Sequence, residues 1–137
     1  MQAAGPRDGE IVDGSLLTSD LSATDSFQEV SRGAILAMGS SEIINRYSGV
    51  IYLAGETFGY QVCDKLKVFV YLERLEGNEW VPAAQRFYDS ENAISLSEGV
   101  YLTVPKNYYY RVKGSHAAIK GNVTETNTTR TKGIYIE

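Results

Sequence analysis

Residues 102–114 read LTVPKNYYYRVKG, which indicates the end of one β-strand, a tight turn at Pro105 and the start of a second strand. This segment holds the densest aromatic cluster of the chain, so we expect it near the middle of a β-sheet protein. Because side chains alternate along a strand, the second strand has two faces. One face carries Tyr108, Tyr110 and Val112, and the other carries Tyr109, Arg111 and Lys113.

The clearest strand covers residues 66–75. Its apolar set and its mixed set alternate with a period of two, which is typical of a sheet with one buried face: Leu66, Val68, Val70 and Leu72 against Lys67, Phe69, Tyr71 and Glu73. Gly77-Asn78 then predicts a hairpin turn. The return strand begins at Trp80, and Pro82 predicts that it lies at an edge or carries a bulge.

Shorter strands are predicted around these two. We expect strands at 42–47, 50–54, 93–97, 100–104 and 134–136, with breaks at Gly39-Ser40-Ser41 and between Gly55 and Gly59. The polar segment 116–131 is predicted to be a long loop or an irregular hairpin. About seven short strands and no helical period predict an all-β fold, namely a single antiparallel β-sandwich of the immunoglobulin or fibronectin III type over residues 33–137.

Residues 1–32 are polar and poor in aromatic residues, and we expect them to form a flexible N-terminal segment. The first six residues lack the basic and apolar regions of a signal peptide. We expect that a signal peptide has been removed and that the protein is secreted. A few apolar side chains could dock this segment onto the sheet: Ile11, Val12, Leu16, Leu17 and Phe27.

Composition narrows the classes of function. A chain of 137 residues fits one domain, and its net charge of -4 argues against a nucleic-acid-binding protein. No apolar run is long enough for membrane insertion. The single cysteine, Cys63, cannot form a disulfide within the chain, and its surroundings predict a buried, inert thiol.

The motif Tyr110-Arg111-Val112-Lys113-Gly114 resembles strand F of a fibronectin type III or immunoglobulin-like domain. With the turn at Pro105, it resembles a tyrosine corner, in which a tyrosine hydroxyl bonds to the backbone upstream. The resemblance implies that role for Tyr110, with Tyr108 as the second choice. No tryptophan lies on the strand before residue 66, which departs from the immunoglobulin pattern.

A second resemblance covers roughly residues 48–137. The blocks VYLERL at 70–75, NEWV at 78–81, YYYRVKGSH at 108–116 and GIYI at 133–136 are similar to a family of small uncharacterised exported proteins of Gram-positive bacteria (Bacillota). The resemblance implies export and a β-sandwich, and it implies no activity.

Catalytic and metal-binding chemistry find little support in the sequence. His116 is the only histidine, and adjacent strand residues face opposite ways, so His116 is poorly placed to activate Ser115. The acidic residues lie mostly near turns, and no cluster has the spacing of a zinc or calcium site. We therefore expect no catalytic residues, no metal and no cofactor, and we expect a protein that is not an enzyme.

The ten tyrosines are the main functional hint, since a core of this size does not need them all. Tyr71, Tyr101, Tyr109 and Tyr135 lie on the phase opposite to the predicted core. They either form cross-strand pairs that stabilise the sheet or present exposed rings to a ligand. The candidate binding residues are Tyr71, Tyr109 and Arg111.

Three functions follow, in order of preference. The first is a non-catalytic module that binds a protein or a cell-surface glycan, as a monomer or weak dimer. The second is a carbohydrate-binding module that uses one aromatic sheet face, and the third is a hydrolase. A row of exposed aromatic rings beside polar side chains would favour sugar binding, whereas a pocket holding His116 or two facing carboxylates would favour an enzyme.

Overall fold

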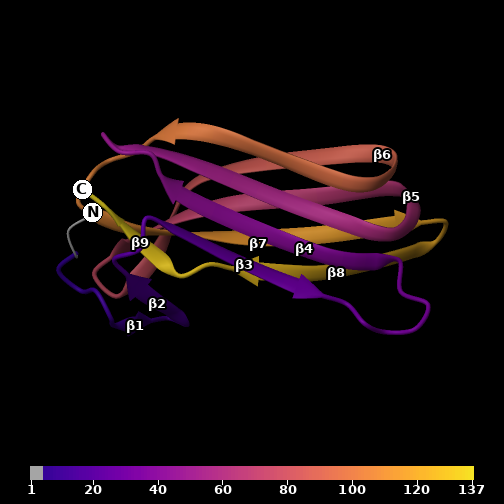
Figure 1. Cartoon of the computed structure of the whole chain (residues 1–137), viewed down its shortest axis with the longest axis horizontal. Helices are drawn as coiled ribbons and strands as arrows, with labels where there is room; N and C mark the ends of the chain where they lie inside the picture. Colours follow the sequence, from indigo (N-terminus) through magenta and orange to yellow (C-terminus); the bar gives the residue numbers. More distant parts are fainter. Residues whose placement is uncertain (1–4) are drawn as a thin grey trace.

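The computed structural model describes residues 5–137 and is all-β. Figure 1 shows the strands, whose bounds are β1 Ile11–Val12, β2 Ser15–Thr18, β3 Ser22–Gln28, β4 Leu36–Asn45, β5 Val50–Glu76, β6 Glu79–Thr103, β7 Tyr108–Lys120, β8 Val123–Arg130 and β9 Gly133–Ile136. Within these residues the structure contains no helix long and apolar enough to span a membrane.

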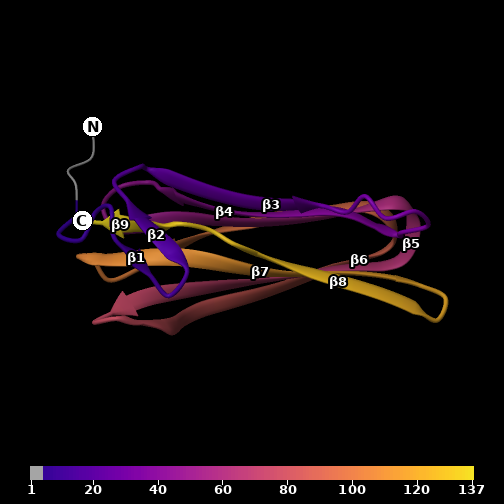
Figure 2. The same cartoon turned by 90° about the horizontal axis from the view of Figure 1, so that it is seen from below.

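The strands form one curled sheet. Its order is β1-β2-β9-β7-β5-β4-β3, with β6 added beside β5 and β8 added beside β7. Figure 2 shows β3 and β4 in one layer and β7 in the other. The sheet is mixed, because β2 runs parallel to β9 while the other pairs are antiparallel.

The β5–β6 hairpin connects the two layers. Residues 50–58 of β5 pair with β4 and with the second half of β6, whereas residues 65–76 pair with β7 and with the first half of β6. The register shifts between Phe58 and Cys63, where the hairpin passes from one layer to the other. The predicted all-β class is confirmed. The sheet is mixed and strongly curled into a half-barrel, so it differs from the predicted antiparallel sandwich of the immunoglobulin or fibronectin III type in its parallel β2–β9 pair and its shared β5–β6 hairpin.

The N-terminal region was predicted to be a flexible segment over residues 1–32 whose apolar side chains could dock onto the sheet. The docking is confirmed for Val12, Leu17 and Phe27, and strands replace the flexible chain. Residues 11–28 contribute three strands: β1 pairs with β2, β2 with β9 and β3 with β4. Their polar composition reflects one solvent-facing side of each strand. Residues 1–4 lie outside the described residues.

Two other predicted breaks are also strands. Gly39-Ser40-Ser41 lies inside β4. Residue 39 is glycine because any side chain there would collide with the rings of Phe27 and His116. Gly55 lies inside β5, and it is glycine for a similar reason, since a Cβ there would come within 2.7 Å of the Val70 side chain.

Residues 116–131 were predicted to form a long loop or an irregular hairpin. The hairpin is confirmed and it is regular, because the end of β7 pairs with β8 from Lys113↔Arg130 to Lys120↔Val123 without a register shift.

The core lies between the layers. The predicted inward set of β5 is confirmed, because Leu66, Val68, Val70 and Leu72 are all at most 1% exposed. They pack with buried side chains of β4, β7 and β9. This core fixes which side of β5 and β7 faces outward.

Three local predictions are confirmed. The Tyr110 hydroxyl donates a hydrogen bond of 2.6 Å to the carbonyl oxygen of Pro105. Gly77, with φ of 64°, forms the hairpin turn between β5 and β6 together with Asn78. The strand that contains Pro82 has a register shift opposite Leu72 and Glu73 and pairs, among the described strands, with β5 alone.

Candidate functional site

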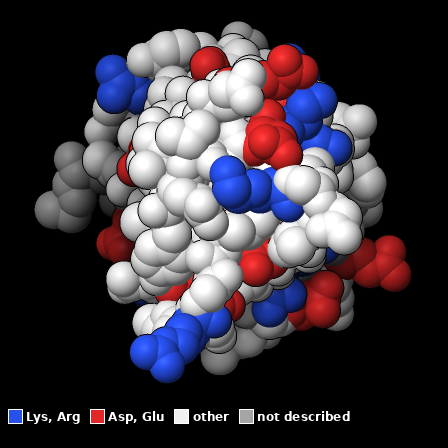
Figure 3. All heavy atoms as spheres, turned by 90° about the vertical axis from the view of Figure 1, so that its right-hand side faces the viewer, with Lys and Arg blue, Asp and Glu red and all other residues white. Residues whose placement is uncertain are grey.

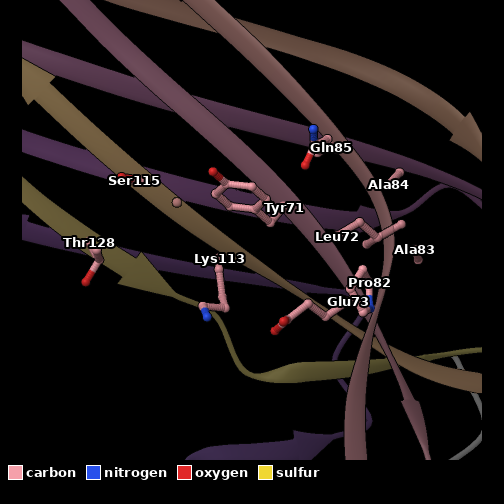
Figure 4. Close-up of a pocket in the computed structure, with 11 residues that line it drawn as sticks. Tyr71, Leu72, Glu73, Pro82, Ala83, Ala84, Gln85, Lys113, Ser115 and Thr128 are labelled. Carbon is pink, nitrogen blue, oxygen red and sulfur yellow. The ribbon is translucent and has the colours of Figure 1, made fainter.

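The outer face of β5, β6 and β7 contains a hollow of about 670 Å³. We call it the outer hollow. Figure 4 shows its lining side chains, which include Tyr71, Glu73, Pro82, Ala83, Gln85, Lys113, Ser115 and Thr128. Its volume lies within the range of about 300–1,000 Å³ that small-molecule sites usually have.

The β-bulge in β6 shapes this hollow. Leu72 pairs with Ala84 and Glu73 with Pro82, so Ala83 is the extra residue on β6. A bulge bends its strand and raises the local twist. The small side chains of Ala83 and Ser115 line the hollow together with the Tyr71 ring, which lies among the other lining residues in Figure 4.

Aromatic rings continue from Tyr71 across the same outer face. The rings of Tyr71 and Phe69 are nearly parallel, at 5° with centroids 5.9 Å apart. Phe87 lies opposite Phe69 in the β5–β6 pair, and the centroids of the two rings are 4.5 Å apart. The Phe87 side chain is 46% exposed. The outer hollow therefore opens beside a row of three aromatic side chains.

Polar groups border the hollow with both donors and acceptors. Lys113 and Gln85 can donate, and the carboxylate of Glu73 can accept. Arg111 fixes that carboxylate, because its Nε donates a hydrogen bond of 2.7 Å to Oε1 of Glu73. The arrangement can hold a ligand that combines flat apolar surface with hydroxyl groups.

The structure separates the three predicted binding residues. Tyr71 lines the outer hollow, but Tyr109 and Arg111 are each only 3% exposed and do not line it. Of the two alternatives for Tyr109, the exposed ring is not what forms and the cross-strand pair is confirmed, because Tyr109 pairs with Tyr135 with ring centroids 4.9 Å apart. The Tyr109 side chain does point to the predicted outer face of β7, but the N-terminal strands β1 and β2 cover that face.

The covered region is a second apolar cluster, which we call the covered end. It comprises Val12, Leu17, Leu75 and Tyr109, with Trp80 and Tyr135 packed against them. Arg111 lies beside it, where its guanidinium stacks 4.5 Å from the Trp80 ring and donates to the Asp13 carbonyl and the Ser15 hydroxyl, each at 2.9 Å. Arg111 thus contributes to the hollow only indirectly, by positioning Glu73.

The other predicted outward tyrosines also differ in place. Tyr101 is 62% exposed and contacts Tyr52, away from the outer hollow. Tyr135 is half-buried against Tyr109. Sequence reasoning missed Gln85 and Thr128, whose positions depend on the bulge in β6 and on β8 being a strand.

His116 and Cys63 are both buried. The ring of His116 is 0% exposed, with Nδ1 3.1 Å from the Thr57 hydroxyl and Nε2 2.9 Å from the Thr129 hydroxyl. Burial lowers the pKa of His116 to about 4. Burial also raises the pKa of the Cys63 thiol, so at neutral pH this group is protonated. Ser115 faces the outer hollow while His116 faces the core, as the alternation predicted.

Charged side chains of both signs mix over the surface. Figure 3 shows this on the end of the molecule that lies at the right in Figure 1. Across residues 5–137 the structure brings together no group of three or more His, Cys, Asp or Glu side chains able to hold a metal ion.

Comparison with known proteins places the chain by sequence. A family of unknown function, DUF6147, matches residues 8–133. No curated protein and no solved structure matches the chain. The match begins before β1 and ends at the start of β9, so the family unit includes the N-terminal strands that cover Tyr109.

Proposed function

Since the chain belongs to DUF6147, a family of unknown function, we propose its function from geometry: it is a non-catalytic binding module that recognises a carbohydrate in the outer hollow. The observation that carries this proposal is the row of Tyr71, Phe69 and Phe87 beside a polar-lined hollow. Sugars have flat faces of C–H groups and rims of hydroxyls, and this surface offers complementary partners for both.

The chemistry of the hollow favours a neutral or weakly charged glycan. Apolar ring faces stack on aromatic side chains, and hydroxyl groups both donate and accept hydrogen bonds. Lys113 and Glu73 supply one charge of each sign, and Ser115 and Thr128 supply hydroxyls. The volume of the hollow accommodates a short oligosaccharide.

We also propose that the protein acts outside the cell, where it meets surface glycans. This rests on the likeness of blocks such as YYYRVKGSH at 108–116 to exported proteins of Gram-positive bacteria.

The test is binding of labelled protein to a broad glycan array and to purified Gram-positive cell walls. The Tyr71→Ala variant is expected to lose the signal. Tyr101→Ala is the matched control, because Tyr101 is an exposed tyrosine that does not line the hollow. Equal loss in both variants, or no binding by the wild type on either surface, would remove the proposal.

A further inference from the structure

The second half of β6 presents a long free backbone edge. Among the described strands, β6 pairs with β5 alone, and it forms the upper rim of the molecule in Figure 1. The opposite strand of the same layer, β3, does have a neighbour, because the Asp25 carboxylate accepts a hydrogen bond from the backbone N–H of Arg130, the last residue of β8.

The hydrogen-bond pattern shows which groups point outward along this edge. The N–H of Val104 donates to the carbonyl of Gly49 at 2.8 Å, and the register from Val50↔Thr103 to Phe58↔Ser95 has no shift. In an antiparallel pair, hydrogen-bonded and non-bonded residue pairs alternate. The backbone groups of residues 95, 97, 99, 101 and 103 therefore point away from β5.

The two halves of β6 differ in how this edge is protected. Natural edge strands avoid pairing with other chains by means of proline, bulges and charged side chains, above all lysine. The first half of β6 has Pro82 and the bulge at Ala83. Residues 95–103, SLSEGVYLT, contain no proline, lysine or arginine, and Glu98 is their single charged residue. This half of the edge is open to another strand.

A second copy of the chain can pair with this edge in a register centred on Gly99. Antiparallel pairing centred on Gly99 sets residue 97 opposite residue 101 of the other copy and residue 95 opposite residue 103. All of these have outward backbone groups. Leu96 then faces Leu102, and Glu98 faces Val100, so no like charges lie opposite one another. The register centred on Glu98 would instead place that carboxylate against itself.

We propose that the chain forms a two-fold symmetric dimer by pairing residues 95–103 of β6 edge to edge, centred on Gly99. A contact of this kind is isologous and closes on itself, so it forms a dimer and not a fibre. The layer containing β3, β4, β5 and β6 becomes continuous across both copies. The outer hollow remains free, since its β6 residues, 82–85, lie in the other half of the strand. The proposal is independent of the proposed function.

Sedimentation equilibrium over a range of protein concentrations tests the dimer. The key variant is Ser97→Pro, which removes an outward N–H without removing a bond to β5. The matched control is Ser97→Ala, since both variants lose the hydrogen bond from the Ser97 hydroxyl to Glu56. We expect the wild type and Ser97→Ala to dimerise and Ser97→Pro to dimerise at least about tenfold more weakly. A wild type that stays monomeric, or a Ser97→Pro variant that dimerises equally well, overturns the proposal.

Disulfide trapping tests the register and decides the matter if Ser97→Pro fails to fold. Gly99→Cys is made together with Tyr52→Ala, because a Cβ at Gly99 would collide with the Tyr52 hydroxyl. The two engineered thiols then face each other with Cα atoms about 5.5 Å apart, which suits a disulfide. In Ser97→Cys they lie about 13 Å apart. Cys63 is 1% exposed and does not compete. Cross-linking of Gly99→Cys alone supports the proposal, whereas cross-linking of both variants or of neither contradicts it.

Discussion

The outer face of β5 and β7 has two ends that share the same alternation of side chains and differ in what covers them. At the covered end, Tyr109 and Arg111 lie beneath β1 and β2 and are each 3% exposed. At the other end, Tyr71 and Lys113 line the outer hollow. Each end combines aromatic rings with a cationic side chain. The same residue types are buried where the N-terminal strands cover them and line an open hollow where no strand does.

The contrast shows what the sequence pattern contains. Alternation assigns a side chain to a face of the sheet, because neighbouring side chains on a strand point in opposite directions. Whether that face meets solvent depends on contacts between distant segments. Here the Arg111 side chain, on β7, is buried by Asp13 and Ser15, which lie almost a hundred residues earlier.

The largest expected effect comes from breaking the covered end. Arg111→Ala leaves the Glu73 carboxylate, 16% exposed, without its buried partner. We expect the free energy of unfolding to fall by about 4 kcal/mol. Urea unfolding measures this, with Lys113→Ala on the same face as the control, expected to change stability by less than about 0.5 kcal/mol. Similar losses in the two variants would contradict the distinction between the ends.

Next in size is a pH effect on the inner side of the same strand. Because the folded pKa of His116 is about 4, below the ordinary 6.5, the unfolded chain binds the proton more tightly. The stability from neutral His116 is complete above about pH 6.5 and is lost as the pH falls toward 4, by about 3 kcal/mol. Urea unfolding of wild type and His116→Gln across this range tests it. Equal pH slopes would show that His116 is not the cause.

A smaller effect is expected at the turn that joins β6 and β7. Tyr110→Phe removes the hydroxyl that bonds to Pro105, and we expect a loss of about 1 kcal/mol in the free energy of unfolding. Tyr108→Phe, at a side chain that is 36% exposed, is the control. The prediction fails if thermal and urea unfolding show the two variants to be equally stable.

The smallest expected effect on stability is at Ser115, in the outer hollow. Ser115→Ala changes one lining hydroxyl of the outer hollow next to buried His116. We expect a stability change within about 0.5 kcal/mol, because the side chain faces solvent. Glycan binding should weaken if Ser115 contacts the ligand. A large loss of stability would mean that the hollow is structural at this position.

Local chemistry explains which parts of the fold could be predicted from the sequence. The alternation in residues 66–75 identified the inward set of β5. Gly77 indicated the hairpin turn, and Pro82 indicated the irregular strand. Both features depend only on residues close in sequence. The Tyr110 hydrogen bond spans only five positions.

Tertiary contacts explain what the sequence did not reveal. Gly39 is a residue type common in turns, yet it lies within β4. Glycine is needed there because the rings of Phe27 and His116 occupy the space of a side chain. The threonines of β8 form a strand because β7 provides a ladder for them. Of the candidate site, Tyr71 was identified by its phase, whereas Gln85 and Thr128 required the bulge and β8. Tyr109 was misassigned because its cover comes from the N-terminal strands.

The central claim is that Tyr109 stabilises the fold, whereas Tyr71, on the same sheet face, contributes little to stability and is free to bind a ligand. Comparing Tyr109→Ala with Tyr71→Ala by urea unfolding tests this most directly and requires no ligand. We expect Tyr109→Ala to lose about 3 kcal/mol, since a buried aromatic ring is removed, and Tyr71→Ala to lose less than about 1 kcal/mol. Equal losses in the two variants would contradict the claim.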